Sequence, residues 1–215
     1  MSRLVLLGLA TVVPVVAAAA FFLSHRSGED GTSRTGARSR SEMHEALTSF
    51  DPAAPRAGLL AIHEAAADDP DTLCTVALEI FESGNAAERW AAVYALSIVI
   101  ERGDTEAVEA LRESLEAEDL DERLAAAEGL IASGEKAGFP VLIELLGSPE
   151  TTTTVVIPLW RVARGLLLTY AEEDLGGLRE ATDGRAAAAA RPAWESWWAA
   201  RGPGLTWDAQ TGKFR

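Results

Sequence analysis

The chain has 215 residues and is 48% hydrophobic, which allows one domain with a substantial core plus terminal appendages. Its 33 acidic residues outnumber the 19 basic ones, and this balance argues against nucleic-acid binding, which depends on clustered Lys and Arg. A single cysteine, Cys74, excludes an internal disulfide, and its apolar neighbours predict a small core residue.

The N-terminal region predicts a membrane segment or an export signal over residues 1–23. Leu4 to Leu23 contains no charged residue and is long enough to cross a bilayer core of about 30 Å as a helix. Residues 17–20, all Ala, could form a cleavage site, but Phe21-Phe22-Leu23 continues the apolar run and favours an uncleaved anchor. We expect the following domain outside the cytoplasm, although four Arg residues between positions 26 and 40 favour the opposite orientation.

Residues 24–42 are rich in Ser, Gly, Arg and Thr and predict a flexible polar linker. From residue 43 to residue 201 the apolar residues recur with helical spacing, and no run alternates as a strand would. The sequence therefore predicts an all-α repeat domain over 43–201, followed by a tail, 202–215, that packs on the last repeat. The expected helices are 42–50, 56–67, 72–83, 86–101, 105–117, 121–133, 136–146, 155–171 and 185–201.

An internal repeat lies in the middle of the chain. Residues 88–96, ERWAAVYAL, align with residues 122–130, ERLAAAEGL. Further along, Val108, Leu111 and Leu115 align with Phe139, Leu142 and Leu146. A helix–turn–helix unit of this size cannot bury its apolar face alone, so copies of it must stack on one another.

The second copy resembles a bacterial HEAT-like repeat of the PBS-lyase type. This resemblance rests on residues 121–130, Gly134-Glu135 and residues 139–146, with an Arg and small residues in the first helix and a Pro with leucines in the second. The first copy resembles it less fully, because Glu109 stands in place of the Pro. The resemblance implies an α-solenoid of about four antiparallel helix pairs that binds other proteins and has no shared catalytic residues.

Two arginines and three tryptophans are the candidate functional residues. Arg89 and Arg123 occupy equivalent repeat positions, and we expect them to hold adjacent repeats together through carbonyls or acidic side chains. Four of the six tryptophans lie in the final 22 residues, where they predict a cap on the last repeat. The alternative is an exposed aromatic patch that contacts a partner, with Trp197, Trp198 and Trp207 as candidates.

The sequence contains no recognisable catalytic or metal-binding motif. Its three histidines, His25, His44 and His63, lack a second ligand at metal spacing. We therefore expect no catalysis, cofactor or metal, and a membrane-tethered scaffold that binds a protein partner. An accessory subunit or lyase-like enzyme of the same repeat class, and a structural envelope protein, are the alternatives.

Overall fold

The computed structural model describes residues 38–100, 105–152, 157–171 and 173–215. The predicted membrane segment or signal peptide over residues 1–23 and most of the predicted linker lie outside these residues. Within the described ranges, no helix combines the length and the apolar character needed to cross a membrane.

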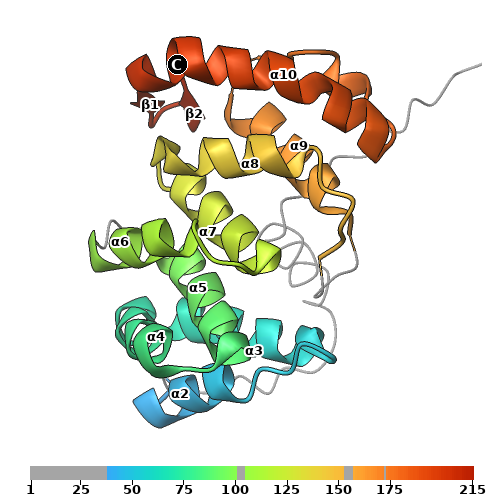
Figure 1. Ribbon diagram of the computed structural model, residues 1–215. Helices are drawn as coiled ribbons and strands as arrows, with labels where there is room; N and C mark the ends of the chain where they lie inside the picture. The colour runs from blue at the N-terminus through green and yellow to red at the C-terminus, as the bar shows by residue number, and fades with distance from the viewer. Residues whose placement is uncertain (1–37, 101–104, 153–156, 172) are drawn as a thin grey trace, which may run out of the picture.

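Nine α-helices form the described part of the chain (Figure 1). They are α2 (Arg40–Thr48), α3 (Pro55–Asp68), α4 (Pro70–Ser83), α5 (Ala86–Val99), α6 (Thr105–Ser114), α7 (Leu120–Ala132), α8 (Phe139–Leu145), α9 (Leu159–Tyr170) and α10 (Gly184–Arg201). Three short 3-10 helices accompany them, η2 (Lys136–Gly138), η3 (Leu178–Glu180) and η4 (Gly202–Gly204).

The helices stack as successive pairs along one direction, from α2 at the bottom of Figure 1 to α10 at the top. The pairs are α3 with α4, α5 with α6, α7 with α8, and α9 with α10, preceded by α2. The first helices form one row, in which α3 contacts α5, α5 contacts α7, and α7 contacts α9. We call this row of first helices the inner layer. The arrangement confirms the predicted all-α solenoid of about four helix pairs.

Side-chain caps define several helix starts. Ser39 and Glu42 form a capping box at α2, and Asn85 and Glu88 form another at α5. Asp69 caps α4 next to Pro70, a residue suited to the first helical turn. Because Ser39 is a cap, α2 begins at Arg40 and not at the expected residue 42. The polar linker predicted over 24–42 therefore ends earlier, and Arg38 donates a 2.7 Å hydrogen bond to the Ala61 carbonyl of α3.

Two further elements differ from the sequence prediction. The helix expected over 155–171 begins at Leu159, after Pro158. The tail forms a two-stranded antiparallel hairpin in which β1 (Trp207–Asp208) pairs with β2 (Lys213–Phe214). Strands of two residues are too short to show the alternation by which a strand is recognised in a sequence.

The core is one apolar cluster that runs through the whole stack. Its middle contains many small side chains, Ala91, Ala92 and Ala95 of α5 and Ala126 and Ala127 of α7, all buried. At Gly129 the two helices come closest, since a Cβ added there would lie 2.6 Å from Cβ and 2.7 Å from Cα of Ser97. The absence of a side chain at Gly129 therefore sets the distance between α5 and α7.

We expect the substitution Gly129→Ala to destabilise the protein by about 1–3 kcal/mol, because the new methyl group would push against the α5 backbone. This loss should exceed the gain of about 1 kcal/mol in helix propensity. Chemical denaturation of the wild type and of Gly129→Ala measures the difference in their free energies of unfolding. Gly204→Ala is the control, because a Cβ there meets no atom within 4 Å. Equal stability of the two variants would contradict the close packing of α5 on α7.

Candidate functional site

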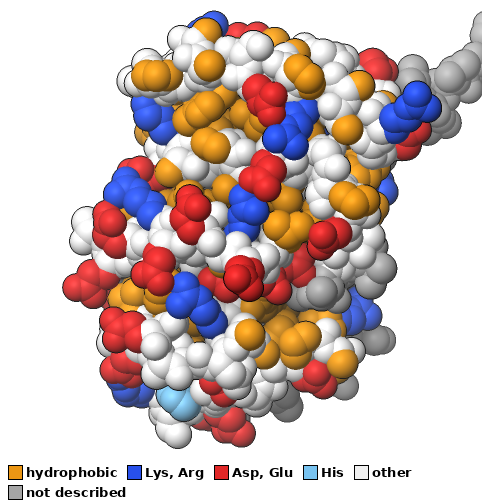
Figure 2. Space-filling model, viewed as in Figure 1, with side chains coloured by type: hydrophobic (Ala, Val, Ile, Leu, Met, Phe, Trp, Pro, Cys, Tyr) orange, Lys and Arg blue, Asp and Glu red, His pale blue; other side chains and the backbone are white. Residues whose placement is uncertain are grey.

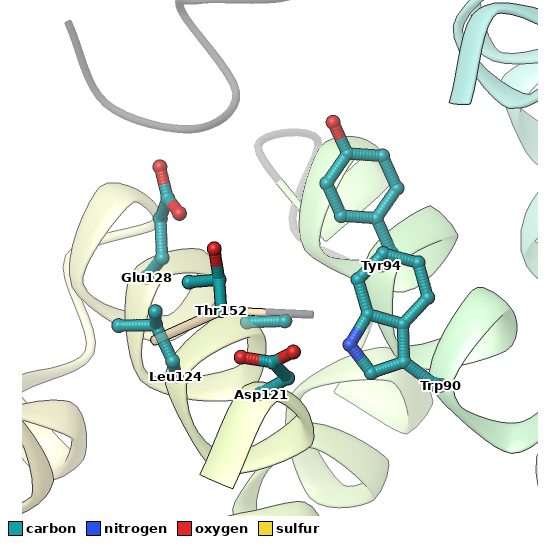
Figure 3. A pocket seen from close by; sticks show the side chains of 7 residues that line it. Trp90, Tyr94, Asp121, Leu124, Glu128 and Thr152 are labelled. Atoms are coloured by element: carbon teal, nitrogen blue, oxygen red, sulfur yellow. The ribbon is translucent and has the colours of Figure 1, made fainter. Parts of the chain in front are cut away.

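A groove lies between α5 and α7 on the inner layer (Figure 3). One wall is made by Trp90 and Tyr94 of α5, and the other by four residues of α7 together with Thr152 from the segment after α8. At its floor is a cavity of about 20 Å³, roughly the room that one water molecule needs. The residues of α7 that line it are Asp121, Leu124, Ala125 and Glu128.

The helical period explains why these residues face the same groove. Trp90 and Tyr94 are four residues apart, and their rings stack at a centroid distance of 5.4 Å with an interplanar angle of 8°. Phe50 stacks on the other side of Trp90 at 4.7 Å. The α7 residues recur at the spacing i, i+3, i+4 and i+7, which is one face of a helix. The groove therefore has an aromatic wall on α5 facing a wall with two carboxylates on α7.

Several polar side chains that line the groove are buried. Asp121 and Glu128 are only 8% and 4% exposed. The pKa of Tyr94 is raised, first by burial of the phenol and second by the negative charge of Glu128. The indole Nε1–H of Trp90 is buried and makes no hydrogen bond within the described residues. In Figure 3 this nitrogen faces the groove on the side of the Asp121 carboxylate.

A third helix reaches Tyr94 from the other side. Nε2 of His63, on α3, lies 2.9 Å from the Tyr94 hydroxyl, and the two rings meet edge to face. Burial lowers the pKa of His63, because desolvation disfavours the imidazolium form. A neutral His63 thus orients the tyrosine hydroxyl above the groove.

Arg89 and Arg123 make equivalent contacts in successive pairs. Each donates to the backbone carbonyl eight residues before it, at the end of the preceding pair: Arg89 to Phe81 at 3.4 Å, and Arg123 to Leu115 at 3.0 Å. Each also pairs with an acid on the second helix of its own pair, Glu113 for Arg89 and Glu144 for Arg123. The two arginines therefore bond across the junctions between helix pairs.

Arg89 makes two contacts beyond those that it shares with Arg123. Its Nε lies 2.9 Å from Oε1 of Glu122 on α7, so it also bonds to the following pair. The guanidinium carbon sits 3.9 Å from the centre of the Phe81 ring, a cation–π contact. Glu122 is thereby held by Arg89, whereas its neighbour Asp121 lines the groove.

The comparison with protein families identifies the repeat. A family model described as HEAT repeats matches residues 74–155, which span α5, α6, α7 and α8 together with most of α4. Residues 74–155 of the chain are HEAT-like repeats. No curated protein and no solved structure matches it. This match confirms the predicted HEAT-like repeat and does not test its bacterial, PBS-lyase type. The groove and both arginines lie inside the matched repeats.

The three candidate tryptophans lie at the C-terminal end of the HEAT-like stack. Trp197 is 8% exposed and packs against Phe139, so it offers little surface to a partner. Trp198 stacks on Phe139 from the same helix, at a ring-centroid distance of 5.6 Å, and is partly exposed. Both rings thus pack on Phe139, but only Trp198 keeps part of its surface exposed.

Trp207 belongs to the tail hairpin. Its ring covers Gly134, where an added Cβ would approach it to 2.8 Å, and it contacts Phe214 at 5.0 Å. Lys136 donates to the carbonyls of Pro203 and Leu205, at 2.8 and 3.2 Å, which holds the start of the tail against the turn before α8. Trp198 and Trp207 have their main contacts within the chain, and their accessible edges stay candidate contact surfaces.

The sequence did not single out Trp90, Tyr94, Asp121 and Glu128 as a group. Alignment of the two repeats contains a partial signal, because Tyr94 and Glu128 occupy the same position and both depart from the small residues around them. Nothing in the sequence places Thr152 beside them. Within the described ranges, no cluster of three His, Cys, Asp or Glu residues could hold a metal. Cys74 is buried.

We expect Arg123→Ala to lower the free energy of unfolding by about 1–2 kcal/mol, because the Leu115 carbonyl and Glu144 both lose a charged donor. Arg123→Lys should recover only part of this loss, since a single ammonium cannot reproduce the forked contact. Arg112→Ala is a suitable control, because that arginine makes two side-chain ion pairs on the surface and no hydrogen bond to a backbone carbonyl among the described residues. Unchanged melting of Arg123→Ala would reject the stacking role.

The stabilisation by Arg123 should also depend on pH. Hydrogen bonding to Arg123 holds the pKa of Glu144 below its ordinary 4.5, so the unfolded chain takes up this proton first as the pH falls. The difference in free energy of unfolding between the wild type and Arg123→Ala should therefore be constant above about pH 4.5 and become smaller below it. The change is small, because Glu144 is half exposed and screened by solvent.

Proposed function

We propose that the chain is a scaffold that binds another protein along the inner layer of its HEAT-like repeats. The observation that carries this proposal is the groove between α5 and α7, where aromatic rings and two buried carboxylates meet at the junction of two matched repeats. HEAT repeats are helical scaffolds that commonly serve protein interaction. The groove offers a partner segment the indole N–H of Trp90, a buried donor without a hydrogen bond among the described residues.

Catalysis is not part of this proposal. The groove supplies carboxylates and a tyrosine but no cysteine or serine within its lining, and its cavity is of the size of a single water. The pKa of Tyr94 is raised and not lowered, which does not suit a base near neutral pH. The two alternatives are an accessory or lyase-like enzyme and a structural envelope protein. Neither of them is based on the binding of a partner protein in this groove.

The scaffold proposal predicts a partner whose capture depends on the groove. Full-length tagged protein, crosslinked in its native cells and purified, should recover one protein at a constant ratio. Glu128→Gln should abolish this recovery while circular dichroism still shows a folded helical protein. Glu82→Gln, which removes one exposed acid from α4, should leave it unchanged. Recovery that is identical with both variants would contradict binding at the groove, and no constant partner would contradict the scaffold.

We further propose that the apolar segment over residues 4–23 tethers the chain to a membrane, with the repeat domain on its extracytoplasmic side. This proposal is supported by the length of the uncharged run, which matches the thickness of a bilayer core. The linker after it would separate the repeats from the membrane surface.

We expect the full-length chain to stay in the membrane fraction after an alkaline carbonate wash, and a chain lacking residues 1–23 to leave it. Protease added to intact spheroplasts should degrade the repeats if they lie outside the cytoplasm. Release of the full-length chain by the wash would contradict the anchor. Protection of an anchored chain from protease would contradict the orientation alone.

A further inference from the structure

We propose that residues 31–37, in the second half of the linker, cover the groove between α5 and α7 and accept a hydrogen bond from the Trp90 indole. The segment then competes with the partner protein for the groove, so the inference rests on the proposed scaffold function and adds a regulation to it. Three observations support it: a buried donor that faces the groove, a cavity that fits one small acceptor, and the place where the described chain begins.

The indole of Trp90 requires a hydrogen-bond acceptor. Its Nε1–H can only donate, and it makes no hydrogen bond within the described residues, although Trp90 is only 9% exposed. Figure 3 shows this nitrogen on the side of the ring that faces the groove. A buried donor without an acceptor is unfavourable, so a group that brings an oxygen to this point of the groove is stabilised there.

The groove selects a small and uncharged acceptor. Its cavity of about 20 Å³ has room for one oxygen atom of the size of a water. Asp121 and Glu128 line the same cavity, are almost fully buried and have interactions of their own, so we assign them no ligand. Two carboxylates nevertheless disfavour an anionic acceptor beside them. A main-chain carbonyl is neutral and small, and every residue of a peptide supplies one.

The described chain begins beside the helix that adjoins the groove. Arg38 donates a 2.7 Å hydrogen bond to the Ala61 carbonyl of α3 and forms an ion pair with Glu64 of the same helix. On another side of α3, His63 contacts the hydroxyl of Tyr94, which belongs to the aromatic wall of the groove. The residues before Arg38 therefore start from α3, one helix away from the groove.

Residues 31–37 are long enough to reach the groove from this starting point. A helix with its side chains is about 10 Å across, and α3 contacts α5 directly. An extended chain advances about 3.3 Å per residue, so seven residues cover about 23 Å. This length crosses α3 and leaves several residues to lie along the groove. The attachment at Arg38 also gives the segment a high effective concentration at the groove, which favours even weak contacts.

Charge and side-chain size distinguish residues 31–37 from the first half of the linker. Residues 31–37, GTSRTGA, contain one Arg and no acid, whereas residues 24–30, SHRSGED, contain one Arg and two acids. Residues 41–150 contain 24 acidic and six basic residues, a net charge of −18, and Figure 2 shows acidic side chains over the lower and middle parts of the visible face. This surface attracts the first segment and repels the second. Small side chains also let the main chain of residues 31–37 approach the groove closely.

The test is disulfide trapping in the full-length chain, in which Cys74→Ser removes the natural thiol. Ala125→Cys places one thiol in the groove lining, and the second is introduced at one position at a time from Gly31→Cys to Ala37→Cys. We expect one or two of these positions to form the disulfide about tenfold faster than the others. The control replaces Ala125→Cys by Ala199→Cys, an exposed position on α10. Trapping that is no faster with Ala125→Cys than with Ala199→Cys would overturn the proposal.

A second measurement leaves the groove unaltered. Arg38→Ala releases the segment from α3, so the NMR signal of the Trp90 indole N–H, which Trp90→Phe assigns, should shift and its hydrogen should exchange faster with water. Arg40→Ala is the control, because it removes an ion pair with Glu79 of α4 and leaves Arg38 in place. A Trp90 signal that is the same in the wild type and in Arg38→Ala would overturn the proposal, as would equal effects of the two variants.

The competition is measured by recovery of the partner from an extract of the native cells. The full-length chain with the trapped disulfide should recover about tenfold less partner than the same chain after reduction. Equal recovery in the two states would show that the segment does not compete, and the inference would be wrong. If no disulfide forms while a constant partner is still recovered, only this inference falls. If the disulfide forms but neither state recovers a constant partner, the scaffold function falls, and with it the competition.

Discussion

The close approach of α5 to α7 is the constraint on which the rest of the structure depends. It is possible because Gly129 has no side chain and lets the backbone of α7 meet Ser97 of α5 directly. Repeats of this kind derive their stability from the interface with the next repeat and not from within themselves. The same approach brings Trp90 and Tyr94 opposite Asp121 and Glu128, so the groove is a product of the stacking.

The arginines and the groove have different parts in the contacts between helix pairs. Arg89 and Arg123 join successive pairs through main-chain carbonyls and surface acids. Along the groove, by contrast, the side chains at equivalent positions differ between copies, Trp90 against Leu124 and Tyr94 against Glu128. Equal residues at the junction keep the geometry of the stack, and unequal residues in the groove give it a distinct chemistry.

The repeated segments made the stack predictable, because helical spacing and caps such as Asp69 and Asn85 are local signals. The groove was not predictable in the same way. It depends on the distance between α5 and α7 and on Thr152, which arrives from a distant turn. Spacing alone also could not decide which of Trp197 and Trp198 is buried. Trp194 lies three residues before the one and four before the other, and both spacings place two residues on the same face of a helix. The hairpin of Trp207 and Phe214 was missed because its strands are two residues long.

The tail hairpin reaches beyond the helix pair from which it emerges. From the end of α10 it returns to Gly134, Lys136 and Phe139, all of which belong to the preceding pair. Terminal units of a linear stack normally fray first, because they have a neighbour on one side only. Opening of α9 and α10 would also require the tail to leave these residues, so the hairpin ties the terminal pair to the pair before it and opposes fraying of that end.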